Sequence, residues 1–191
     1  MKNIRAKILA TSLVLAAVSP AAFAADGTIT FTGRISAQTC TISGDGGGRN
    51  FTVTLPPISS STLATANNVA GRTPFNIRLT GCTPNTGNAA VHFEPGATVD
   101  LGTGRLRNTV VTAPASGSTP AVTAAGNVQI GLLNADLTNI AVGSAFASQN
   151  SQQVAITNGA ATLQYFAEYV ATGAATAGTL STSVMYSVVY P

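Results

Sequence analysis

The sequence predicts an all-β protein, a sandwich of two sheets, on three observations. Apolar residues recur mainly at every second position in short runs, as in strands with one buried face. Clusters of glycine, proline, asparagine and serine separate these runs. The 191 residues, 45% hydrophobic and only 8% charged, suffice for one domain with a sizeable core. A second domain is not expected.

Nine segments carry the alternation. The expected strands are residues 28–35, 38–42, 51–55, 74–79, 89–93, 127–132, 153–156, 164–170 and 183–190. The glycine-rich stretch 44–48 predicts a flexible turn, prolines 56–57 end a strand, and the pair Asn158-Gly159 is typical of a tight turn. A short helix is expected around residues 60–67. The stretch 112–126 predicts a long surface loop.

The first 24 residues have the pattern of a secretory signal peptide. A basic start with Lys2, Arg5 and Lys7 precedes an apolar run over residues 8–18, and residues 22–24 form a small-x-small cleavage pattern. Without this segment, six basic residues face six acidic ones. That balance, with no clustered positive charge, argues against nucleic acid as a partner. Export from the cytoplasm is therefore expected.

Cys40 and Cys82 are the only cysteines. Because an exported chain meets an oxidising compartment, we expect them to form a disulfide. Two buried free thiols are the alternative, and a metal site would need more ligands than these cysteines and His92, the single histidine.

The inventory of titratable side chains argues against an enzyme. No serine lies in a G-x-S-x-G turn, and no glycine-rich loop carries the lysine that a phosphate site needs. His92 is expected at the rim of a strand whose neighbours Val91 and Phe93 face inward. Glu94 and Asp100 are expected on a solvated loop rather than as a catalytic or calcium-binding pair. We therefore expect no catalytic residues, no metal and no cofactor.

The two ends of the expected mature chain stand out from the rest. Near the front, Ile29, Phe31, Gly33, Ile35 and Ala37 share one face of a strictly alternating segment. At the back, alternate positions from Leu180 to Tyr190 share one face, namely Leu180, Thr182, Val184, Tyr186, Val188 and Tyr190. A last strand that stops one residue before the end of the chain leaves an edge to which another strand can add.

In these segments the chain resembles the major structural subunits of chaperone–usher fimbriae, the type 1 fimbrial protein family. The resemblance rests on the amphipathic arm with its central Gly33, on Cys40 soon after it, and on residues 74–79 leading to Cys82. It continues through residues 164–169 and 171–176. It ends on a penultimate aromatic residue, Tyr190, with Gly178 fourteenth from the end.

The resemblance implies an incomplete immunoglobulin-like sandwich, completed by a donor strand from the next subunit. It divides the chain into a signal peptide (1–24), a donor-strand arm (25–37) and a pilin domain (38–191). The implied function is that of a structural subunit which polymerises by donor-strand exchange into a surface fimbria mediating bacterial adhesion. Strand addition between a pilin and its chaperone is a known recognition mode.

The implied partners are identical subunits, a periplasmic chaperone, an outer-membrane usher and a tip adhesin or adaptor. The subunit passes through the periplasm and ends outside the cell. The C-terminal strand, with Gly178, Val184, Tyr186, Val188 and Tyr190, faces the chaperone. The alternatives are a minor, adaptor or terminator subunit of the same organelle, a small outer-membrane β-barrel, or a soluble sugar-binding module. A sugar-binding module would need clustered aromatic residues, whereas this chain has no Trp and only four Tyr.

Overall fold

The computed structural model describes residues 27–191, so the expected signal peptide lies outside the described residues. The chain divides into two parts, Met1–Ile35 and Ser36–Pro191, and the second holds the fold. Its described elements are twelve in number. They are β1 (Thr39–Gly44), η1 (Ser60–Leu63), β2 (Val69–Thr83), β3 (Gly87–Phe93), β4 (Val99–Asp100), β5 (Arg105–Arg107), β6 (Val128–Asn134), β7 (Asn139–Ile140), η2 (Phe146–Ser148), β8 (Gln153–Ile156), β9 (Ala161–Ala171) and β10 (Tyr186–Val189).

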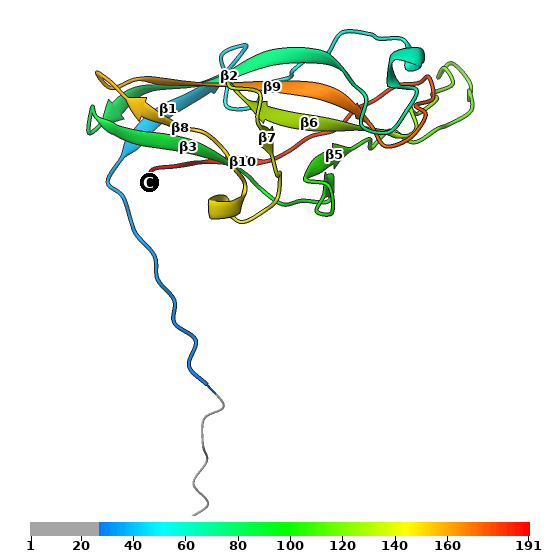
Figure 1. The fold of residues 1–191 in the computed structure, drawn as a ribbon. Helices are drawn as coiled ribbons and strands as arrows, with labels where there is room; N and C mark the ends of the chain where they lie inside the picture. The colour runs from blue at the N-terminus through cyan, green and yellow to red at the C-terminus, as the bar shows by residue number, and fades with distance from the viewer. Residues whose placement is uncertain (1–26) are drawn as a thin grey trace, which may run out of the picture. The chain divides into compact units, whose positions relative to one another are not determined.

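The strands form two antiparallel sheets, which confirms the all-β prediction. The larger sheet has the order β1-β2-β9-β6-β5-β4, with β7 added beside β6, and the smaller one has the order β10-β3-β8. The long strands β2 and β9 lie side by side at the centre of the larger sheet (Figure 1). Of the described residues, only the short 3₁₀ turns η1 and η2 are helical, and none forms a helix long and apolar enough to cross a membrane.

The core lies where the alternating positions of the sheets meet. On β2 the side chains of Phe75, Ile77 and Leu79 are buried, whereas the residues between them are half-buried or exposed. Tyr165 on β9 is fully buried and contacts two further rings, with centroids 5.7 Å from Phe75 and 5.3 Å from Phe93. Such aromatic contacts connect the two sheets through one apolar cluster.

The connection between β8 and β9 is the tight turn predicted from its sequence, although the two strands then enter different sheets. Asn158 and Gly159 have φ of 51° and 74°, and Thr157 and Ala160 bridge across them. Both positions of this turn type need positive φ, which glycine and asparagine tolerate best.

Three expectations about the elements need correction. Residues 28–35 and 51–55 alternate as predicted but belong to no strand in the structure. The short strands β4, β5 and β7 were not predicted, because two or three residues carry no recognisable period. The predicted helix around 60–67 is a single 3₁₀ turn, η1. Ser59 caps the N-terminus of this turn, because its side-chain oxygen accepts a hydrogen bond from the Ser61 N–H.

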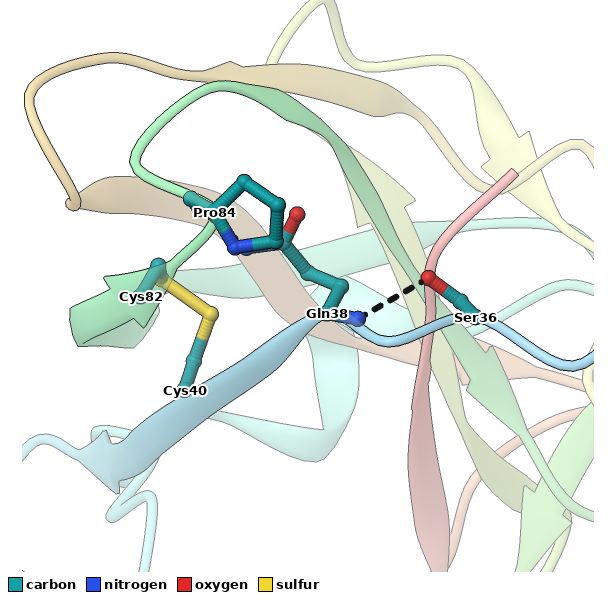
Figure 2. The surroundings of a disulfide bond; sticks show 5 residues. All are labelled: Ser36, Gln38, Cys40, Cys82 and Pro84. Carbon is teal, nitrogen blue, oxygen red and sulfur yellow. Dashed lines mark hydrogen bonds between the residues drawn. A yellow bond between two sulfur atoms is a disulfide. The ribbon is translucent and has the colours of Figure 1, made fainter.

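The structure confirms the predicted disulfide. Cys40 on β1 and Cys82 on β2 are bonded across neighbouring strands, 42 residues apart in sequence (Figure 2). Since β1 is an edge strand of the larger sheet, the bond holds this edge to the centre of the fold.

We predict that replacing both cysteines (Cys40→Ala with Cys82→Ala) destabilises the fold. Closing a loop of this length contributes roughly 3–4 kcal/mol in the chain-entropy estimate. The amount of exported protein, measured by immunoblot against an unchanged transcript level, should fall severalfold. Alkylation mass spectrometry of the wild-type exported protein should find no free thiol; two alkylated cysteines would contradict the disulfide.

Candidate functional site: an unfilled groove beside the C-terminal strand

A long cavity opens along one side of the sandwich, with a volume of about 1140 Å³. Two extended stretches form its edges, residues 51–55 and residues 180–188. The floor consists of core side chains from both sheets, namely Phe75, Ile77, Phe93, Leu106, Ile130, Leu132 and Ala167. We call this cavity the groove. It gives direct access to the hydrophobic core.

The edge at 180–188 forms hydrogen bonds on its outer side. The carbonyl of Ser181 accepts from the N–H of Thr109, and the carbonyl of Met185 accepts from the N–H of Glu94. For the main-chain groups of Thr182 and Val184, which alternate with these, residues 27–191 supply no partner. This edge can therefore accept another strand on the groove side.

The opposite edge also lacks partners. Residues 51–55 are extended, with Phe51, Val53 and Leu55 half-buried against the core and the two threonines between them exposed. Their main-chain groups form no hydrogen bond within the described part of the chain. A half-paired edge and an unpaired edge thus flank an apolar floor, which is the environment that a β-strand would complete.

The two edges touch at Tyr186. Its hydroxyl donates to the carbonyl of Arg49 over 2.9 Å, and its ring lies edge-on to Phe51 at 6.4 Å. Burial raises the pKa of the Tyr186 hydroxyl, with the Arg49 charge acting in the opposite direction. The hydroxyl therefore stays protonated and remains a donor at neutral pH.

Asp45 holds the chain that leads into the 51–55 edge. Its carboxylate accepts from the main-chain N–H of Asn76 at 2.8 Å and forms an ion pair with Arg78 at 3.0 Å. Burial is the largest single influence and works to raise the pKa of Asp45. The Asn76 and Arg78 contacts together outweigh it and hold this pKa below its ordinary value. This contact therefore stabilises the fold above the ordinary aspartate pKa and weakens as the carboxylate is protonated in acid.

The structure distributes the predicted C-terminal residues over three environments. Val184, Tyr186 and Val188 are half-buried and line the groove, and the exposed residues between them lie along it as well. Tyr190 lies beyond β10 and is partly buried against the core, outside the groove lining. Gly178 precedes the groove edge and packs against the main chain at Ala124 and Ala125.

The packing explains the glycine at 178. A Cβ atom there would lie 2.4 Å from the main-chain nitrogen of Ala125 and 2.5 Å from the carbonyl carbon of Ala124. Because of this close approach, the Ala125 N–H reaches the carbonyl of Thr179 at 2.9 Å. Gly178 therefore positions the start of the 180–188 edge, a role that its place in the sequence alone did not reveal.

Near the other terminus, the predicted arm residues are exposed. Ile29, Phe31 and Ile35 are 80%, 88% and 101% exposed, and no atom lies within 4 Å of a Cβ placed on Gly33. Ala37 is also exposed but belongs to the part that begins at Ser36. Three large apolar side chains on one face of a short segment thus lack burial in the isolated chain.

The side chains considered for catalysis do not form a site in the described residues. His92 lies at the rim with Val91 and Phe93 buried beside it, as predicted, and its ring contacts the carbonyl of Ser144 and the carboxylate of Glu94. Asp100 instead pairs with Arg107 and Gln129. Residues 27–191 contain no group of three or more histidine, cysteine, aspartate or glutamate residues able to hold a metal ion.

Comparison with known proteins agrees with this architecture. The family model of the type-1 fimbrial protein, A (FimA), matches residues 55–191. The major fimbrial subunit SMF-1 of Stenotrophomonas maltophilia is 50% identical over 181 residues, which cover 93% of this chain and 99% of that protein. The F17 fimbrial protein of Escherichia coli is 44% identical over 183 residues, covering 93% of this chain and 94% of that protein.

Solved structures show the same fold. The crystal structure of the P pilus rod subunit PapA matches with a TM-score of 0.55 at 18% identity, over 80% of this chain and 99% of that one. A chaperone–usher pilus structure matches with a TM-score of 0.55 at 19% identity, over 87% and 96%. The described fold is thus the immunoglobulin-like sandwich of pilus subunits.

Fold and groove define a β-sandwich subunit with an open strand position. The chain belongs to the type-1 fimbrial protein family, as its resemblance predicted. It is a structural fimbrial subunit, and its place is in a surface fimbria outside the cell. This family is one of fimbrial subunits and not of enzymes.

We predict that Gly178→Ala destabilises the subunit by about 1–3 kcal/mol, because the added methyl group must displace main chain. Thermal melting of the purified protein should shift down by several degrees. Gly96→Ala is the matched control, since no atom lies within 4 Å of a Cβ at Gly96 and its melting should be unchanged. Equal melting of the two variants would show that the close approach at residue 178 is unimportant.

Proposed function

We propose that the subunit polymerises head to tail by donor-strand exchange, the arm of one copy (residues 25–37) filling the groove of the next. The observation that carries the proposal is the complementarity within one chain. The groove lacks a strand between two open edges, and the arm is an exposed strand-like segment whose apolar side chains alternate. Each feature supplies what the other needs.

The free energy of such an exchange comes from burial and from main-chain pairing. Burying Ile29, Phe31 and Ile35 would contribute roughly 1.5–3 kcal/mol each. New hydrogen bonds to both edges would add about 1 kcal/mol each. Since the arm and the groove are different surfaces, the contact is heterologous and does not close, so repeated addition gives a filament.

Gly33 fits this arrangement because it has no side chain and lies between Phe31 and Ile35 on one face of the arm. A strand that enters the groove brings Ile29, Phe31, Ile35 and Ala37 to the floor on the same face as Gly33. At a shallow point of the groove, a glycine would leave room for the incoming main chain to approach the edges.

Before assembly the groove needs a temporary occupant, because an open apolar groove in a soluble subunit invites aggregation. We assign this role to a periplasmic chaperone that lends a strand along the 180–188 edge and contacts Val184, Tyr186, Val188 and Tyr190. The signal peptide, residues 1–24, delivers the chain to that compartment. An outer-membrane usher then exchanges the lent strand for the next arm, and a tip adhesin or adaptor begins the filament.

The arm can be tested with Phe31→Arg. In a neighbour's groove the guanidinium would enter an apolar site at a cost of several kcal/mol, which should block assembly and leave the sandwich folded. Electron microscopy of the producing cells should show no fimbriae, while the subunit still co-purifies with its chaperone. The matched control is Thr32→Arg, which places the same charge on the other face of the arm. Abundant fimbriae from Phe31→Arg would falsify the exchange.

The C-terminal contact can be tested with Tyr190→Ser. Losing the ring removes apolar surface from the strand that the chaperone contacts, so the subunit should be captured poorly and degraded in the periplasm. Pull-down with the tagged chaperone should recover several times less subunit at equal transcript level. Ser187→Ala, at an exposed position of β10, removes no apolar surface and is the control. Equal recovery of the Tyr190→Ser variant would argue against this role.

A further inference from the structure

The residues that connect the arm to the sandwich are fixed by contacts of their own. The compact part begins at Ser36, three residues ahead of β1. Figure 2 shows Gln38 between Ser36 and Pro84, next to the disulfide. We call residues 36–38 the arm root.

The Gln38 side chain adds a hydrogen bond between the two chain segments just beyond the end of the β1–β2 main-chain pairing. The outermost main-chain pair joins Thr39 to Thr83. Pro84, the next residue on that side, has no N–H, so the ladder stops there. The side-chain amide of Gln38 donates instead to the Pro84 carbonyl over 2.5 Å. A side chain thus adds one further link beyond the disulfide.

The turn that follows β2 has room for this amide. A Cβ on Gly87 would lie 3.0 Å from the Gln38 side-chain oxygen, closer than such contacts normally are. Gly87 also has φ of +145°, which side-chain-bearing residues rarely adopt. The glycine therefore leaves open the space that the Gln38 amide occupies.

The main chain of the root is held as well. The N–H of Gln38 donates to the Ser36 hydroxyl oxygen at 3.1 Å. Two residues further on, Cys40 is bonded to Cys82. Residues 36–40 are consequently tied to the sandwich by the amide link to Pro84 and by the disulfide, and a local hydrogen bond joins Gln38 to Ser36 within the root.

We propose that Gln38 is a positioning residue that sets where the rigid sandwich ends and the arm begins, and thereby sets the bending stiffness of the filament. This inference rests on the proposed donor-strand exchange. In a filament the arm is fixed in the neighbour's groove, so the segment between that groove and the first anchor of its own sandwich is the joint between subunits. Releasing Gln38 would move the first anchor to the Thr39–Thr83 pair and lengthen this joint by one residue. A longer unrestrained linker bends more easily.

The test is Gln38→Glu, measured on purified fimbriae. The carboxylate has nearly the size of the amide but cannot donate to the Pro84 carbonyl. We expect assembled fimbriae whose persistence length in electron micrographs is shorter than that of the wild type. Hydrogen exchange at residues 36–40 should be faster by about fivefold, since a lost hydrogen bond is worth about 1 kcal/mol.

Gln152→Ala is the matched control. Gln152 also donates its side-chain amide to a main-chain carbonyl, that of Gln164, but lies on the sandwich away from the root. Its variant should keep the stiffness of the wild type. Ser36→Ala, which removes only the bond within the root, should give a stiffness between the two.

Two results would overturn the inference. Gln38→Glu fimbriae with wild-type persistence length and exchange rates would show that the amide link does not define the joint. Failure of Gln38→Glu to fold, seen as loss of the chaperone-bound subunit, would make Gln38 a stability residue instead. Failure of strand exchange itself is detected separately, by normal fimbriae from Phe31→Arg.

Discussion

The missing strand between residues 51–55 and 180–188 is the constraint on which the rest of the molecule depends. The core contains rings and aliphatic side chains from both sheets, yet no segment of the sandwich, residues 36–191, covers them along this line. An apolar surface of that kind is stable in water only when another chain covers it. The fold and the polymerisation that we propose are therefore two aspects of one requirement.

The features around the groove serve to keep its shape while it is unfilled. Gly178 brings the start of one edge against residues 124–125, and Asp45 holds the approach to the other edge on β2. The disulfide secures β1, whose root leads to the arm. A rigid groove loses less conformational entropy when a strand enters it, so these contacts favour assembly.

Much of this was visible in the sequence, and the exceptions have physical causes. Period-two alternation identified the central strands β2 and β9 and the half-buried face of Val184, Tyr186 and Val188. It could not show that residues 51–55 lack a partner, because alternation reports which face is buried and not whether the edges are paired. The close approach at Gly178 and the amide of Gln38 depend on residues more than 40 positions away, and a single sequence contains no signal for such contacts.

Gln149 is fully buried, and its side-chain amide both accepts from the N–H of Phe93 at 2.8 Å and donates to the carbonyl of Phe93 at 2.7 Å. An amide side chain thereby imitates one residue of a neighbouring strand. With β10 on its other side, β3 is saturated at Phe93, and no foreign strand can add there. Because further strands cannot add to β3 at Phe93, the polymer can grow linearly and does not extend sideways into the stacked sheets of an aggregate.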